Sequence, residues 1–319
     1  MSTHLRTPEV GTEFTPVAVD RLELGEGVRI LRDGRVVLVD ILAGRLLSLP
    51  DTPGAPLIEL ARLEEPLGAV APLAAGAGFL AAAGTGFTRL APDGNLISRT
   101  SLPDLEGWPP RRMNDAACDA QGRLWAGSMA YDAAPGAGAL HRLDPDGAVV
   151  TVLKGLTVPN GPAVSPDGAT LYLADSAEGA VYAFDMDPAT GVLSGRRLFF
   201  RLAPGSGSPD GMTVDDEGRL WSAVWGAAQV RCYAPDGRLL LTLALPAQQP
   251  TSVCLTGNRL IVTTARYGLP APGPLDGAVL SVPCDATAPP AASRTVCSWP
   301  DGRHGGAGDP PWHPSIIHI

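Results

Sequence analysis

The chain has 319 residues, of which 45% are hydrophobic and 18% charged, so it is long enough to bury a large core. Its net charge of -9, with no basic cluster interleaved with aromatic residues, argues against nucleic acid as a partner. No apolar run approaches the ~18 residues of a membrane span and the N-terminus has no signal-peptide core, which predicts a soluble cytoplasmic protein without a membrane partner.

A glycine turn followed by a β-prone run recurs six times. In chain order the runs are DGRVVLVD (33–40), GFLAAAG (78–84), GRLWAGSM (122–129), GATLYLADS (168–176), GRLWSAVWG (218–226) and GNRLIVTTAR (257–266). Each is followed by a second strand-like segment, such as AGRLLSLP or GALHRLDPDG. Paired short strands repeating every ~40 to 50 residues are typical of propeller blades, and no segment has the 3.6-residue period of a helical solenoid.

The repeat predicts an all-β fold, a six-bladed β-propeller over residues 21–290 with an axial divalent metal site. We expect residues 1–20 to form an N-terminal arm that helps to close the ring, and residues 291–319 to form a partly irregular C-terminal tail. A β-sandwich is the alternative, but it does not require a strand pair to repeat six times at nearly constant spacing.

The prediction of a metal site comes from polar residues at one offset from the turn glycines. The residues eight positions before those glycines are Glu26, Val70, Asn114, Asn160, Asp210 and Gln249. Innermost propeller strands surround the axis, so the four strong oxygen donors in this set should converge at the entrances of the first strands. Two carboxylates and two amides suit a hard divalent cation such as Ca²⁺, Mg²⁺ or Mn²⁺.

Glycine follows three of these donors, at Gly27, Gly161 and Gly211. It allows backbone conformations that turn a side chain toward the axis and lets a ligand approach closely. The alternative is that each donor is an ordinary turn former, because N-G and D-G are common hairpin signals. That alternative explains any one of them more easily than four in phase.

Several long motifs resemble those of the SMP-30, gluconolactonase and luciferin-regenerating-enzyme family, also called the regucalcin family. They are LGEG around Glu26, RRMNDAACDAQGRLWAGSM (111–129), VPNGPAVSPDGATLYLADS (158–176), SPDGMTVDDEGRLWSAVWG (208–226) and PTSVCLTGNRLIVTTAR (250–266). The resemblance covers residues ~22 to 285 and implies a six-bladed propeller with one axial divalent metal. The chain departs from the family pattern at GEGVRI, which lacks the usual proline and tryptophan, and at Ala116, where glycine is commoner.

The resemblance also implies roles for individual residues. Glu26, Asn160 and Asp210 match the family's metal ligands. Arg112 and Asn114, in the R-x-N motif, match substrate-contacting residues, with Asn114 near or on the metal. Asp132, after SMAY, takes the place of an acidic residue that contacts sugar hydroxyls in some members.

Together these features predict a metal-dependent hydrolase that opens a small, sugar-type lactone to its hydroxy acid. Asp210 is expected to accept a proton from the attacking water, and the cofactor is expected to be Ca²⁺, with Mn²⁺, Mg²⁺, Zn²⁺ and Fe²⁺ as alternatives. The sequence has no G-x-S-x-G elbow and no histidine in phase with the donors, so a covalent intermediate is not expected. Two alternatives stay open: action on another ester or a secondary-metabolite intermediate, and a non-catalytic calcium-binding propeller.

Overall fold

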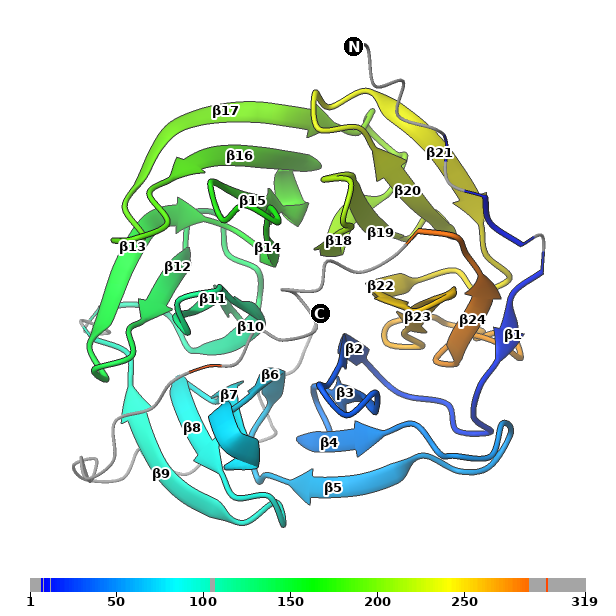
Figure 1. Ribbon diagram of the computed structural model, residues 1–319, viewed down its shortest axis with the longest axis horizontal. Helices are drawn as coiled ribbons and strands as arrows, with labels where there is room; N and C mark the ends of the chain where they lie inside the picture. The colour runs from blue at the N-terminus through cyan, green and yellow to red at the C-terminus, as the bar shows by residue number, and fades with distance from the viewer. Residues whose placement is uncertain (1–6, 8, 12, 104–106, 287–296, 298–319) are drawn as a thin grey trace.

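The computed structural model describes residues 7, 9–11, 13–103, 107–286 and 297. Six four-stranded antiparallel sheets surround a central axis in the order of the sequence, as Figure 1 shows. This arrangement confirms the predicted six-bladed β-propeller. Most of the C-terminal tail expected over 291–319 lies outside the described residues. In the part of the chain that the structure describes, no helix is long and apolar enough to cross a membrane.

Each blade has an inner strand beside the axis and a second strand paired with it. The inner strands are β2 (Gly25–Ile30), β6 (Leu67–Pro72), β10 (Arg111–Cys118), β14 (Pro159–Val164), β18 (Ser208–Val214) and β22 (Pro250–Thr256). The second strands are β3 (Val36–Asp40), β7 (Phe79–Ala83), β11 (Leu124–Ala130), β15 (Thr170–Asp175), β19 (Leu220–Trp225) and β23 (Arg259–Thr264).

The third and outer strands complete each blade. The third strands are β4 (Arg45–Ser48), β8 (Gly86–Leu90), β12 (Gly138–Leu143), β16 (Ala180–Met186), β20 (Gln229–Tyr233) and β24 (Val279–Pro283). The outer strands are β5 (Ile58–Arg62), β9 (Leu96–Ser101), β13 (Val149–Leu156), β17 (Leu193–Arg201), β21 (Leu239–Ala244) and β1 (Thr15–Pro16). Two short 3₁₀ helices, η1 (Ala74–Gly76) and η2 (Ser176–Glu178), lie in the connections.

The last blade combines both ends of the propeller sequence. Its outer strand is β1, which pairs with β24 through Thr15↔Ser281 and Pro16↔Leu280. A segment expected in the N-terminal arm therefore supplies the outermost strand of the blade built from β22, β23 and β24.

The sequence predicted two strands per blade, and the structure has four. The six repeated runs contain the second strands, and the segments that follow them contain the third strands. Outer strands give a weak sequence signal because their apolar side chains are partly in solvent, as Leu96 and Leu198 are. Inner strands give a weak signal because polar residues and glycines interrupt them, and these interruptions carry the candidate site.

Six hydrophobic clusters form the core, one across each boundary between neighbouring blades. Trp221 of β19 packs with Val253 of β22, for example, and Trp125 of β11 packs with Leu171 of β15. A further cluster joins Leu38 of the first blade to Ile261 of the last. Because the clusters follow one another around a closed ring, each blade is fixed on both sides, and the inner strands hold their positions around the axis.

His141 on β12 is a buried, neutral part of this framework. Its Nε2 lies 2.8 Å from the Ser128 hydroxyl and its Nδ1 lies 3.1 Å from that of Thr151. Burial lowers the pKa of His141 to about 4, and the positive charges of Arg111 and Lys154 act in the same direction.

A pH titration of stability tests this assignment. An unfolded histidine titrates near pH ~6.5, so between that pH and about 4 the unfolded chain binds a proton that the folded chain does not. Stability is therefore lost as pH falls, by roughly 2 to 3 kcal/mol between pH 7 and pH 4.5 from this group. Urea unfolding at both pH values, for the wild type and His141→Gln, should give a smaller loss in the variant. An equal loss in the two proteins would contradict the assignment.

Candidate active site

The four predicted donors lie inside the inner strands and not at strand entrances, which corrects the sequence interpretation. Glu26, Asn114, Asn160 and Asp210 lie on β2, β10, β14 and β18. In each of these strands the pairing with the second strand is interrupted at the donor. The interruptions lie between Glu26 and Arg29, Met113 and Ala116, Asn160 and Ala163, and Pro209 and Met212. Such bulges break the side-chain alternation and re-aim a residue, which brings the donors toward one region near the axis.

The glycines after the donors serve two different purposes. Gly27 and Gly161 have φ angles of 55° and 50°, the left-handed conformation that residues with a Cβ rarely adopt. Gly211 does not have a positive φ. A Cβ there would lie 2.7 Å from the Thr251 carbonyl oxygen, so Gly211 allows β18 and β22 to approach closely. The bulge thus depends on a left-handed backbone conformation at Gly27 and Gly161, and on the close approach of neighbouring strands at Gly211.

The fixed offset of eight residues fails in the other two blades. Their pairing is interrupted between Leu67 and Ala69 and between Pro250 and Ser252, so the equivalent positions are Gly68 and Thr251. Val70 and Gln249 are two residues away from these positions because the turn between inner and second strand differs in length. The Thr251 hydroxyl donates to the Gly25 carbonyl, and a Cβ on Gly68 would lie 2.1 Å from the Asn114 carbonyl oxygen. Both positions therefore serve strand packing.

Hydrogen bonds order the two amides. Asn114 Nδ2 donates to Asn160 Oδ1 at 2.6 Å and to the Pro159 carbonyl at 3.0 Å. Asn160 Nδ2 in turn donates to the Ser176 hydroxyl at 2.9 Å. An amide oxygen has two lone pairs, so Asn160 Oδ1 can accept this bond and still offer one lone pair to a cation. The network therefore orients Asn160 Oδ1 and leaves one of its lone pairs available.

Three buried carboxylates meet at this level of the ring. Glu26, Asp210 and Asp115 are only 5%, 4% and 6% exposed. Burial raises the pKa of Glu26 well above its usual value, and the negative charges of Asp210 and Asp115 raise it further. Burial and the charge of Asp115 likewise raise the pKa of Asp210. Among the described residues, Asp210 Oδ1 has no hydrogen-bond partner although it is buried.

Sequence reasoning missed Asp115 as a member of the site. It follows Asn114 within the β10 bulge, where the usual alternation of faces is suspended. Two consecutive residues can therefore both act on the same cluster. The available signal was the acidic residue immediately after the R-x-N motif.

Arg112 is the positive group next to the cluster. Its Nη1 donates to Asn114 Oδ1 at 2.6 Å and to the Met113 carbonyl at 3.1 Å. Burial lowers the pKa of Arg112, and the acidic groups around it oppose that effect; these groups are Tyr131, Glu26, Tyr267 and Asp210. Tyr131 and Tyr267 follow β11 and β23, so both phenols lie within electrostatic reach of Arg112. Neither tyrosine was among the predicted site residues.

Asp132 does not join the cluster. It is exposed, and its Oδ1 accepts a hydrogen bond from the Ala134 backbone N–H at 3.0 Å within a turn after β11. The structure thus brings Glu26, Asn114, Asn160, Asp210 and Arg112 together and leaves Asp132 outside, one residue beyond Tyr131.

The donor set suits a hard divalent cation. Buried carboxylates that repel one another, with one oxygen left without a partner, are the electrostatic situation that such a cation relieves. Within the described residues no three His, Cys, Asp or Glu side chains form a compact metal-binding group, so two amides would have to complete the set.

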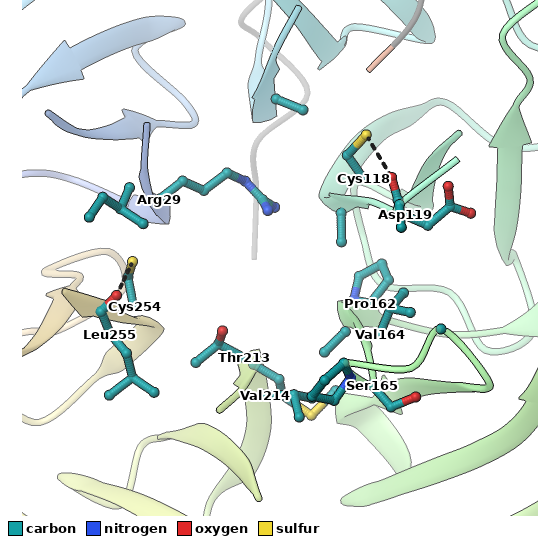
Figure 2. Close-up of a pocket in the computed structure, with 18 of the residues that line it drawn as sticks. Arg29, Cys118, Asp119, Pro162, Val164, Ser165, Thr213, Val214, Cys254 and Leu255 are labelled. Atoms are coloured by element: carbon teal, nitrogen blue, oxygen red, sulfur yellow. Dashed lines mark hydrogen bonds between the residues drawn. The ribbon is translucent and has the colours of Figure 1, made fainter. Parts of the chain in front are cut away.

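A cavity of about 130 Å³ opens at the opposite end of the inner strands (Figure 2). Its lining includes Arg29, Cys118, Val164, Thr213 and Cys254, from five blades. At ~3.3 Å per residue, Val164 lies roughly 13 Å along β14 from Asn160. We call this space the far-end cavity. It is distinct from the carboxylate cluster, and Arg29 projects into it.

Comparisons with known proteins agree with this architecture. The sequence model of the SMP-30/Gluconolactonase/LRE-like region matches residues 24–266. Regucalcin of Danio rerio is 34% identical over 262 residues, covering 80% of this chain and 87% of that protein. Pentonolactonase XacC of Haloferax volcanii is 40% identical over 159 residues, covering 49% and 54% of the two chains.

A solved structure gives the same fold. The crystal structure of a calcium-binding protein, regucalcin, from Agrobacterium tumefaciens has a TM-score of 0.77 and 26% identity to this chain. The superposition covers 86% of this chain and 95% of that one. With the family model matching most of the propeller, and with relatives above 30% identity across most of the sequence, this chain belongs to the SMP-30/gluconolactonase/LRE-like family.

Proposed function

We propose that this protein hydrolyses a small, sugar-type lactone to its hydroxy acid with the help of one divalent cation. The observation that carries the proposal is the cluster of buried carboxylates in which Asp210 Oδ1 lacks a partner, beside two ordered amides and Arg112. The pentonolactonase among its relatives supports a lactone as the substrate class.

Glu26, Asn160 and Asp210 would hold the cation, with Asn114 next to them. When bound, it would polarise the lactone carbonyl as a Lewis acid and lower the pKa of a bound water. Ca²⁺ is the first candidate because the donors are all oxygen atoms and the structural neighbour from Agrobacterium tumefaciens is named a calcium-binding protein. Mn²⁺, Mg²⁺, Zn²⁺ and Fe²⁺ are the alternatives.

The protein's own groups would handle the proton and the substrate. Asp210 would accept the proton from the attacking water, because a carboxylate can bind a cation through one oxygen and keep the other available. Arg112, oriented by its bond to Asn114, would donate to a substrate oxygen. Tyr131 and Tyr267, which lie within electrostatic reach of Arg112, are further candidates for substrate contact. Asp132 lies outside the cluster, and it would contact a sugar hydroxyl through Oδ2 because Oδ1 accepts from the Ala134 N–H.

The experiment that tests the proposal is cation reconstitution. The protein is stripped with chelator, and Ca²⁺, Mn²⁺, Mg²⁺, Zn²⁺ or Fe²⁺ is restored singly while acid release from gluconolactone and xylonolactone is followed. We expect turnover to disappear on stripping and to return at least ~100-fold above the stripped rate with the preferred cation. A lactonase that remains fully active after stripping would overturn the metal role.

Aryl esters and phosphotriesters are assayed in parallel, and the relative turnover rates identify the substrate class. Faster turnover of these compounds than of both lactones would favour the alternative metallo-propeller chemistry. Cation binding with no turnover of any compound would favour a non-catalytic calcium-binding propeller.

A further inference from the structure

Arg29 reaches the carboxylate cluster from the far-end cavity. It lies on β2 three residues after Glu26, and Figure 2 shows its side chain extending into the space between the blades. Its Nη2 lies 3.7 Å from Asp115 Oδ1. The Arg29 side chain is 25% exposed and that of Asp115 is 8% exposed, so the pair is largely shielded from water. Among the described residues, Arg29 Nε is buried without a hydrogen-bond partner.

Asp115 is held firmly in the β10 bulge. Its Oδ1 accepts a hydrogen bond from the Ala116 N–H at 2.7 Å, and the Gly161 N–H of the next blade also stabilises the carboxylate. The charge of Asp115 acts on both Glu26 and Asp210. Burial raises the pKa of Asp115, whereas the charge of Arg29 and the two backbone N–H groups favour the ionised carboxylate. When ionised, Asp115 supplies negative charge to the candidate cation site even though it need not touch the cation.

Two arginines divide the task of compensating the three carboxylates. The positive charge of Arg112 acts to lower the pKa of Glu26 and Asp210, whereas the positive charge of Arg29 acts to lower the pKa of Asp115. With every group ionised, the three carboxylates and two guanidinium groups give this cluster one net negative charge. Among the described residues, no hydrogen bond or ion pair joins Arg29 to the predicted ligands, so Arg29 influences them electrostatically, by compensating the charge of Asp115.

We propose that Arg29 is a positioning residue that acts through Asp115, and that the Arg29–Asp115 ion pair sets how tightly the site binds its divalent cation. The inference rests on the proposed function, because it assumes that the carboxylate cluster holds a cation. At an effective dielectric constant of about 40, a unit positive charge roughly 10 Å from a divalent cation lowers its affinity by about tenfold. Arg29 thus weakens binding and Asp115 strengthens it.

Four variants separate this charge effect from a structural one: Arg29→Gln, Arg29→Lys, Asp115→Asn and the Arg29→Gln/Asp115→Asn double variant. Their net cluster charges, on the same count as above, become -2, -1, 0 and -1. Isothermal titration calorimetry of the chelator-stripped full chain with CaCl₂ at pH 8 should show Arg29→Gln binding about 10-fold tighter than the wild type and Asp115→Asn about 10-fold weaker. Arg29→Lys and the double variant should bind within about threefold of the wild type.

The double variant is decisive, because rescue of Asp115→Asn by a second substitution follows from charge and not from packing. Weaker or unchanged binding by Arg29→Gln, or no rescue in the double variant, would overturn the inference. If Arg29→Gln does not fold, Arg29→Met gives the same neutral test, with the Ca²⁺-induced shift in melting temperature as a second readout. Absence of Ca²⁺ binding by the wild type would instead remove the cation site itself, so the two failures are distinguishable.

Discussion

Replacing Asp210 by Asn is expected to lower lactone turnover by at least about 10³-fold and to abolish tight cation binding, without unfolding the protein. Asn keeps the shape of the side chain but cannot accept a proton from water at neutral pH, and it removes one of the two charged predicted ligands. Loss of a positioned general base commonly costs roughly 10²- to 10⁴-fold in rate. The fold should persist because the substitution relieves repulsion between buried carboxylates.

The measurement compares kcat, KM and the dissociation constant for Ca²⁺ in the wild type and Asp210→Asn. Asp146→Asn is the matched control, because Asp146 is an exposed turn residue that accepts a hydrogen bond from the Ala148 N–H. The activity and cation affinity of the Asp146→Asn protein should remain those of the wild type. If Asp210→Asn retained a tenth or more of wild-type turnover, that result would rule out Asp210 as the proton acceptor.

The blade repeat could be predicted because glycine turns and apolar second strands recur in the sequence itself. GRLWAGSM and GRLWSAVWG both become second strands that are almost fully buried. The inner strands could not be delimited in the same way, because their pairing is interrupted where their most informative residues lie. VPNGPAV contains an amide, two prolines and a glycine, and nothing in that composition indicates a strand.

The donors were found because a constant offset holds in four blades. The same rule selected Val70 and Gln249, since it measures distance along the chain and cannot detect a turn of different length. Asp115 and Arg29 were missed for a different reason. Their importance comes from a contact between β2 and β10, whose residues are more than eighty positions apart, and no local pattern encodes that contact.

Replacing Asp215 by Ala is expected to destabilise the fold by about 3 to 5 kcal/mol. Asp215 is fully buried in the turn between β18 and β19. Its Oδ2 accepts from Arg219 Nε at 2.6 Å and from Trp221 Nε1 at 2.9 Å, while its Oδ1 accepts the backbone N–H of Arg219 at 2.8 Å. Asp119 makes the equivalent bonds in the third blade, so the D-x-x-G-R-L-W sequence is a repeated structural unit.

The expected loss is large because Ala removes the acceptor and leaves its donors in place. Arg219 would keep a 3.2 Å contact with Glu217 but lose its buried counter-charge, and the Trp221 N–H would be left without its acceptor inside the core. Asp236 provides the control: it accepts the Arg238 N–H in an exposed turn, so Asp236→Ala should cost less than about 1 kcal/mol. Urea unfolding midpoints measure both. A loss below about 1 kcal/mol for Asp215→Ala would mean that water replaces the carboxylate as acceptor for the Arg219 and Trp221 donors. The buried aspartate would then shape the turn without stabilising the fold.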